Sequence, residues 1–246
     1  MQQIKNFAVK IHNLSLSRYN KSILIDLNLF LPAGRLSAVI GPNGAGKSSL
    51  INLIMGQLVP DKGYIKLFDQ PLSRVRSQVA YIPQQRTFDT NFPISVSEFI
   101  MTGLYSQIGL INRPQKEDKD KVDHYLKKLN LHTVANTSIS RLSMGQLQRI
   151  CLARVYAQEA SLYFMDEPLS AIDAPTQREI LQEFKCMTRA GKTFIIIHHD
   201  LSFVQEYFDW VVILNKHLIA SGPTKEVFRK KYLEQAYDRE LSLTQV

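Results

Sequence analysis

A glycine-rich stretch at residues 41–48, Gly-Pro-Asn-Gly-Ala-Gly-Lys-Ser, constrains the fold of this chain more than any other feature. An apolar run precedes it at residues 36–40, and a helix-like run follows it at residues 49–55. A strand, a glycine-rich turn and a helix in this order form the context of a phosphate-binding loop. Backbone N–H groups and the positive end of the helix would surround the anion. We therefore predict a phosphate site in which Lys47 reaches the β- and γ-phosphates and Ser48 binds Mg²⁺.

The apolar pattern around this loop predicts an α/β fold. Buried or alternating runs predict strands at residues 8–11, 14–16, 25–31, 36–40, 64–68, 79–82, 162–165, 193–197 and 211–214. Helical patterns occur at residues 49–55, 95–104, 116–129, 144–157 and 176–189. Near-continuous apolar strands separated by helices are typical of a mainly parallel sheet covered on both faces. We expect one domain, residues 1–246, in which an α/β core with an antiparallel part (1–85 and 160–246) carries a helical insertion at about 86–159.

Composition narrows the possible partners and compartment. The formal net charge is +8, but basic residues are spread along the chain, with only short clusters at 127–128 and 229–231. Charge alone therefore does not select nucleic acid over nucleotides or anionic lipid. No apolar run approaches the ~18 residues that cross a bilayer, and the first residues lack a secretion signal, so we expect a cytosolic chain. The isolated Cys151 and Cys186 are expected to be reduced core thiols.

Two consecutive carboxylates follow the apolar run at residues 162–165. Asp166 ends that predicted strand, and Glu167 comes next. The carboxyl ends of parallel strands meet at one edge of the sheet, beside the phosphate loop. We expect Asp166 to hold Mg²⁺ and Glu167 to polarise the water that attacks the γ-phosphate. A merely polar strand end is the alternative interpretation.

A second discriminating stretch is Arg-Leu-Ser-Met-Gly-Gln-Leu-Gln-Arg at residues 141–149. Ser143 can cap a helix that begins near Met144 or Gly145, which would create another anion-facing helix end. Two such ends far apart in the sequence suggest that a second copy of the chain supplies one of them. A capped helix without a ligand is the alternative.

With these motifs in this order, the chain resembles the ATP-binding subunits of ATP-binding-cassette (ABC) transporters, which are P-loop NTPases. The resemblance covers nearly the whole chain. It implies ATP and Mg²⁺ as cofactors, and Met144 and Ser49 stand where Gly and Thr are commonest. Tyr19 takes the place of the aromatic residue that stacks on adenine, and His199 that of the switch histidine. The ATP-binding set that the resemblance implies is Tyr19, Gly41, Pro42, Asn43, Gly44, Ala45, Gly46, Lys47, Ser48, Ser49, Gln84, Ser143, Gly145, Gln146 and Asp166.

The same resemblance implies a head-to-tail dimer with two ATP molecules at its interface. Glu167 and His199 would be the catalytic residues, and Ser48, Gln84 and Asp166 would hold Mg²⁺. Ser143 and Gly145 would face the ATP of the other copy, and residues 170–173 match the loop that crosses the dimer. The implied partners are membrane permease subunits and, indirectly, an extracytoplasmic solute-binding protein, with the chain peripheral on the cytoplasmic face of the inner membrane.

Cargo is indicated only by resemblance. Residues 91–96, 112–114, 198–201 and 206–215 resemble importers of manganese, zinc or ferrous iron, and the last stretch resembles the manganese type most. An importer of iron–siderophore or haem is the alternative. In other classes, a soluble ABC ATPase acting on nucleic acid and a non-hydrolysing nucleotide switch remain open, although no nucleic-acid partner is expected. Candidates for docking the permease are Phe88, Phe92 and Tyr105, each of which could instead be packing.

The cluster His198-His199-Asp200 could be taken for a metal site. Successive side chains at a strand end point to opposite faces, so the two imidazoles should not converge on one ion. We expect His198 to pack inside and His199 to contact the γ-phosphate.

Overall fold

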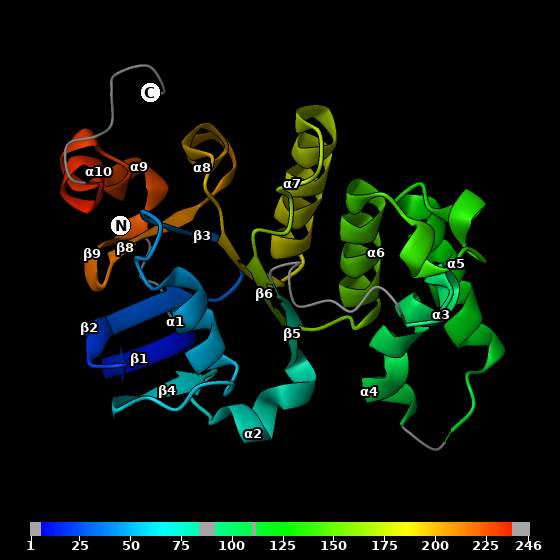
Figure 1. The fold of residues 1–246 in the computed structure, drawn as a ribbon, viewed down its shortest axis with the longest axis horizontal. Coiled ribbons are helices and arrows are strands. Elements are labelled where there is room, and N and C mark those ends of the chain that lie inside the picture. The colour runs from blue at the N-terminus through cyan, green and yellow to red at the C-terminus, as the bar shows by residue number, and fades with distance from the viewer. Residues whose placement is uncertain (1–5, 84–91, 110–111, 238–246) are drawn as a thin grey trace.

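The computed structural model describes residues 6–83, 92–109 and 112–237, and Figure 1 shows its strands and helices. The strands in this part of the chain are β1 Phe7–Arg18, β2 Lys21–Pro32, β3 Leu36–Ile40, β4 Lys62–Leu67, β5 Val79–Ile82, β6 Leu162–Asp166, β7 Thr193–Ile197, β8 Trp210–Asn215 and β9 His217–Pro223. They form an antiparallel sheet of order β2-β1-β4 and a larger sheet of order β5-β6-β7-β3-β8-β9. The larger sheet is parallel except for β9, which runs antiparallel to β8. The predicted α/β class and mainly parallel sheet are therefore confirmed.

The helices of the described residues are α1 Lys47–Ile54, α2 Leu72–Val75, α3 Val96–Met101, α4 Tyr105–Ile108, α5 Lys116–Lys128, α6 Met144–Ala157, α7 Ala174–Arg189, α8 Leu201–Tyr207, α9 Thr224–Val227 and α10 Lys230–Ala236. In Figure 1, α3 to α6 gather at the right, on the opposite side of the larger sheet from β1, β2 and β4. This grouping is consistent with a helical insertion, whose boundaries at about 86–159 stay a prediction. Within the described ranges, no helix has the length and apolar composition that crossing a membrane requires.

The central strands of the larger sheet, β3, β6 and β7, are mainly apolar and buried at every position, so both faces of the sheet are covered there. Alternate residues contact different clusters. On one face, Tyr163, Met165 and Ile196 belong to a core shared with α3, α5, α6 and α7. On the other face, Phe164 and Ile197 pack with α1 and the inner side of the antiparallel sheet. Helix α1 therefore lies between the two sheets, and its buried residues Leu50, Ile51, Leu53 and Ile54 anchor it there.

Helix α6 begins at the predicted residue, whereas α7 begins two residues before the predicted start at residue 176. Ser143 precedes α6, and its side-chain hydroxyl accepts a hydrogen bond from the Gln146 N–H (3.3 Å). The Ser143 N–H in turn donates to the Gln146 Oε1 (3.0 Å). This reciprocal capping box satisfies two amides that the helix itself leaves unpaired. Asp173 caps α7 by accepting from the Thr176 N–H at 3.0 Å, with Pro175 in the first turn.

Some elements differ from the sequence expectation. The two short strands expected at 8–11 and 14–16 form the single strand β1, whose pairing with β2 is irregular between Ile11 and Leu14. Such an irregularity changes which face the side chains occupy and disturbs the alternating pattern. Strand β9 and helix α8 were not expected. The side chains of β9 are mostly half-buried, so its sequence lacks the alternation of a clearly two-faced strand.

Candidate functional site

The phosphate loop connects β3 to α1 and ends in a left-handed glycine. Gly46 has φ +93° and takes the N-cap position of α1 without any side-chain cap. The first N–H groups of α1 are therefore not paired by a capping side chain, and the helix presents its positive end at the loop. Asn43, Gly44 and Ser48 are exposed, whereas Ala45 and Gly46 are buried. This arrangement suits an anion approaching from solvent.

Lys47 reaches back over the loop that precedes it. Its Nζ donates to the carbonyl oxygens of Gly41 at 2.7 Å and Pro42 at 2.9 Å. Burial lowers the pKa of Lys47, and the carboxylates of Glu167 and Asp166 partly oppose that shift. The ammonium group is therefore held at the mouth of the loop, between the backbone and the two carboxylates.

The backbone of the turn between β8 and β9 is hydrogen-bonded to the phosphate loop. The Lys216 N–H donates to the Ala45 carbonyl at 2.9 Å, and the Lys216 carbonyl accepts from the Ile25 N–H at 2.9 Å. The phosphate loop is thus connected through its backbone to the antiparallel sheet as well as to the parallel one. Sequence reasoning did not single out Lys216, because its role uses only backbone atoms.

Strand register brings the predicted carboxylates and histidines to the same edge as the loop. β7 lies between β6 and β3, with Ile197 opposite both Asp166 and Val39. The residues that follow these three parallel strands therefore meet at one edge. They are Glu167 after β6, His198 and His199 after β7, and Gly41 after β3.

Asp166 is 3% exposed and lies among the groups that would handle a phosphate. Burial raises the pKa of its carboxyl, a hydrogen bond with Ser48 lowers it, and the charges of Glu167 and Lys47 act in opposite directions. The Ser48 hydroxyl and the Asp166 carboxylate are thus adjacent oxygen ligands beside the phosphate loop. Mg²⁺ prefers this hard oxygen donor set, completed by phosphate oxygens and water, so the residues present fit the ion.

Glu167 is only partly buried and has an unusual backbone conformation, with φ +49°. Its N–H donates to the Ile197 carbonyl at 3.2 Å, which fastens it to the end of β7. A left-handed conformation is uncommon for a residue other than glycine, and it takes the backbone out of the extended path of β6. The Glu167 carboxylate raises the pKa of both Lys47 and Asp166, so the three charges interact closely.

The two adjacent histidines lie in different environments. His198 is 3% exposed and stacks on Phe208 with a ring-centroid distance of 5.7 Å, while Phe203 meets it edge-on at 5.9 Å. His199 is exposed. In the described residues, no group of three or more His, Cys, Asp and Glu side chains is arranged to hold a metal ion. His198 therefore packs inside the protein, and His199 is free to meet a ligand.

Acid should destabilise the fold through His198. Burial, and secondly His199, lower the pKa of His198 to about 4 from 6.5, with Asp200 opposing. As the pH falls, His198 takes up a proton in the unfolded chain near pH 6.5 but in the folded chain only near pH 4. The free energy of unfolding is therefore highest above about pH 6.5 and decreases as the pH drops towards 4. We expect a loss of roughly 2 kcal/mol between about pH 7 and pH 5. Urea unfolding at both pH values should show this loss in the native chain and in the exposed control His217→Gln, but not in His198→Gln.

The predicted signature residues are not brought to the phosphate loop of their own chain. Ser143 is exposed at the N-terminus of α6, with Met144 57% exposed beside it. Helix α6 packs against α3 and α5, whereas α1 contacts β6. In Figure 1 the two helices lie on different sides of β6. Supply of Ser143, Gly145 and Gln146 by a second copy remains a prediction.

The roles expected for Tyr19 and Gln84 stay predictions. Tyr19 lies in the tight turn between β1 and β2, with φ +49° and a side chain 97% exposed. That exposure leaves its ring available for a base, and Tyr19 remains a predicted stacking residue. Gln84 and Phe88 lie outside the described residues.

Sequence reasoning also missed two glutamines that contact the segment after Glu167. Gln148 on α6 and Gln177 on α7 donate or accept hydrogen bonds at its backbone. Gln148 lies within the signature stretch, but nothing in the local pattern indicates which way its amide points.

Comparison with known proteins settles the family. A family model described as ABC transporter matches residues 24–170, more than half of the chain. The chain belongs to the ABC transporter family. It is therefore an ATPase and binds ATP, as the phosphate loop and neighbouring carboxylates predict.

Individual relatives match over almost the full chain. It is 40% identical to the zinc transport system ATP-binding protein TroB of Treponema pallidum, over 97% of this chain and 90% of TroB. It is 39% identical to the manganese transport system ATP-binding protein MntB of Bacillus subtilis, over 96% of this chain and 94% of MntB. A solved ATP-binding subunit of an ABC transporter superposes with a TM-score of 0.80 and 25% identity, covering 95% of this chain and 97% of that one. The ABC ATPase fold expected from the sequence is confirmed.

Proposed function

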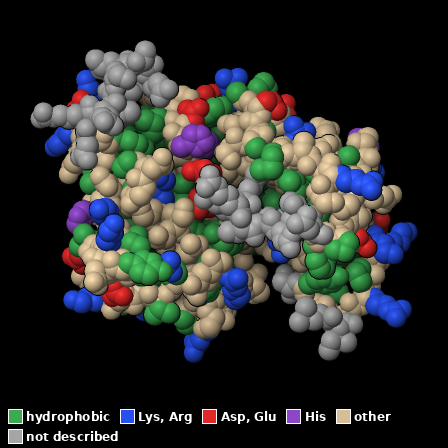
Figure 2. Space-filling model, in the orientation of Figure 1, with side chains coloured by type: hydrophobic (Ala, Val, Ile, Leu, Met, Phe, Trp, Pro, Cys, Tyr) green, Lys and Arg blue, Asp and Glu red, His purple; other side chains and the backbone are tan. Residues whose placement is uncertain are grey.

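We propose that this ABC ATPase drives the import of a divalent transition metal, manganese or zinc, from the cytoplasmic face of the membrane. The observation that carries the proposal is the match of nearly the whole chain to zinc and manganese transport ATP-binding proteins at 40% and 39% identity. A nucleic-acid role is not favoured, since Lys and Arg side chains are scattered over the face shown in Figure 2 and form no single basic block.

The geometry supports a division of labour around ATP. Lys47 would exchange its two carbonyl acceptors for β- and γ-phosphate oxygens. Ser48 and Asp166 would hold Mg²⁺, which supplies charge neutralisation of the phosphates when bound. Glu167 would accept a proton from the attacking water, and His199 would contact the γ-phosphate from the neighbouring strand end. Each of these roles uses a side chain at the shared edge of β3, β6 and β7.

A second copy would complete each site. Ser143 lies at an exposed helix end with a complete capping box, so contacts within the chain fix the N-terminus of α6. A head-to-tail arrangement would place this end, with Gly145 and Gln146, over the phosphates of the other copy. ATP would then join the two copies, and hydrolysis would release them.

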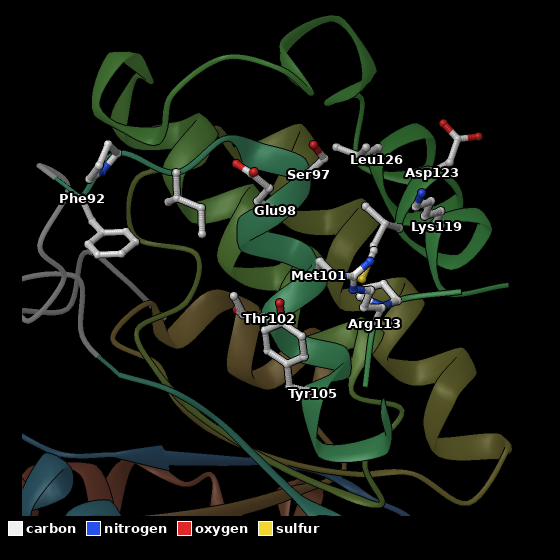
Figure 3. A pocket seen from close by; sticks show the side chains of 14 residues that line it. Phe92, Ser97, Glu98, Met101, Thr102, Tyr105, Arg113, Lys119, Asp123 and Leu126 are labelled. Carbon is white, nitrogen blue, oxygen red and sulfur yellow. The ribbon is translucent and has the colours of Figure 1, made fainter. Parts of the chain in front are cut away.

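We place the permease contact at an open groove in the helical part, with a volume of about 870 Å³. Figure 3 shows side chains from α3, α4, α5 and the Arg113 loop around it. Phe92, which is 61% exposed, lies at one end, and Tyr105, 38% exposed, lies below Met101 and Thr102. Exposed aromatic side chains beside an apolar groove are typical of sites that bind a partner.

Removing the Phe92 ring from the groove should weaken binding of the permease without slowing ATP hydrolysis by the isolated chain. In Phe92→Ala we expect at least a fivefold weaker association with the permease, because hot-spot aromatics each contribute about 1–2 kcal/mol or more to binding. The ATPase rate of the isolated chain should stay within about twofold of the native rate. Co-purification with the membrane subunits measures the first, and phosphate release the second. Val59→Ala, at another exposed apolar residue (83%), is the control and should leave association unchanged.

The cargo is tested by measuring the metal content of cells. Cells lacking this protein would be compared in metal-limited medium with cells carrying the native chain or Glu167→Gln, and their metals would be read by mass spectrometry. We expect manganese or zinc to fall selectively and to be restored by the native chain alone. Unchanged metals would reject the metal proposal, and a selective fall in iron would leave ferrous iron or an iron complex as the cargo. Neither result would alter the family assignment.

A further inference from the structure

The segment that follows β6, residues 167–173, is held from two sides by glutamine side chains. From α6, the Gln148 Nε2 donates to the Glu167 carbonyl at 3.0 Å, and its Oε1 accepts from the Ala171 N–H at 2.8 Å. From α7, the Gln177 Nε2 donates to the carbonyls of Leu169 at 2.9 Å and Ile172 at 2.7 Å. Both glutamines therefore brace the same segment, but at different atoms.

Gln148 is the one that acts on Glu167. It is 2% exposed, so its amide has no access to bulk water and depends on these two bonds. The peptide that it holds carries the left-handed backbone of Glu167, φ +49°. Such a conformation is strained for a residue other than glycine and persists only where the surroundings impose it. The Ser170 hydroxyl shares the Glu167 carbonyl at 3.2 Å, but it belongs to the segment itself and cannot anchor it to another element.

Helix α6 connects this anchor to the exposed signature end. Gln148 follows the N-cap residue Ser143 by about 7.5 Å along the helix axis. Gly145, on the intervening turn, lies against the same segment, because an added Cβ there would be 3.2 Å from the Ala171 carbonyl. A shift of the α6 N-terminus would therefore be transmitted through Gln148 to the Glu167 peptide.

We infer that Gln148 is a positioning residue that sets the Glu167 carboxylate and couples it to the signature end of α6. The inference rests on the proposed function, in which Glu167 activates water and Ser143 faces the ATP of a second copy. Occupation of that end by the second copy would then align Glu167 in the chain that carries the helix. Each copy would thereby be activated for its own ATP by engaging its partner's ATP.

The test separates this role from simple loop stability with three variants of the full-length chain. Gln148→Met keeps the side-chain length and removes both bonds. Gln148→Glu keeps an acceptor for the Ala171 N–H but has no donor for the Glu167 carbonyl. Gln177→Met is the matched control, because it removes two bonds from the same segment without touching Glu167. The kcat and KM for ATP, the thermal unfolding midpoint and ATP-dependent dimer formation would be measured for each.

We expect Gln148→Met and Gln148→Glu to lower kcat at least tenfold, with KM for ATP within about twofold and the dimer still formed with ATP. Gln177→Met should lower the unfolding midpoint at least as much but keep kcat within about threefold. The inference is overturned if kcat is native in Gln148→Met, or if Gln177→Met loses as much kcat. It is also overturned if Gln148→Glu behaves like the native chain, since the donor to Glu167 would then be irrelevant.

The role proposed for Glu167 is checked separately by Glu167→Gln. A native rate of ATP hydrolysis in that variant would reject water activation by Glu167, and the positioning role of Gln148 would be rejected with it. An inactive Glu167→Gln beside a fully active Gln148→Met would reject the role of Gln148 alone.

Discussion

Replacing Glu167 with glutamine should lower the kcat for ATP hydrolysis at least about 100-fold and leave ATP binding intact. General bases contribute typically 10²–10⁴-fold to rate, and an amide of the same size cannot accept the proton from water. Glu167 lies beside Lys47 and Asp166 but is not part of the phosphate loop, so affinity for ATP should persist. Removing its negative charge also relieves repulsion with the γ-phosphate and should favour the ATP-bound dimer.

Phosphate release and size-exclusion chromatography with ATP and Mg²⁺ measure the two effects. The control is Glu179→Gln, an exposed carboxylate on α7 that has no ion pair among the described residues. It should hydrolyse ATP at the native rate and show no added dimer. A Glu167→Gln chain that hydrolyses ATP at full rate would remove Glu167 from catalysis and direct attention to His199.

The predicted strands and helices lie close to those of the structure where one pattern dominates a stretch. The apolar runs of β3, β6 and β7 are buried at every position, and their sequences show continuous hydrophobicity rather than alternation. Helix α6 was predicted with the same bounds, because Ser143 and Gln146 form a capping box that is readable in the sequence. The residues within each of these elements determine its type and bounds, so the sequence of the stretch alone is enough to predict it.

Features of the site that depend on contacts between distant segments could not be predicted in this way. The hydrogen bonds of Gln148 require knowing which face of α6 meets the segment after β6, which only packing determines. The support that Lys216 gives to Ala45 uses backbone atoms, which any residue other than proline would supply. His198 could be assigned to the interior only from strand alternation, whereas its stacking on Phe208 depends on how α8 packs.

Gly41 is the position in the phosphate loop where an added methyl group should do the most damage. Its φ is +154°, and a Cβ built there overlaps the Leu214 carbonyl oxygen on β8 and comes within 3.2 Å of the Ala45 side chain. Since β3 and β8 are adjacent parallel strands, neither backbone can move without breaking their pairing. Strain and overpacking together should cost roughly 2–6 kcal/mol of folding free energy in Gly41→Ala.

The Gly41→Ala substitution should weaken ATP binding as well as lower the stability of the fold. The Gly41 carbonyl accepts from the Lys47 Nζ, so displacing this residue moves both the loop entrance and the ammonium group that binds phosphate. We expect Gly41→Ala to lose measurable ATP affinity and to unfold at a lower temperature, as read by titration with a fluorescent ATP analogue and by thermal unfolding. Gly191→Ala is the control: it has φ +88°, meets nothing within 4 Å and is remote in sequence from the loop, so it pays the conformational cost alone. Equal losses in the two variants would mean that backbone strain, and not the close approach of β8, makes glycine necessary at residue 41.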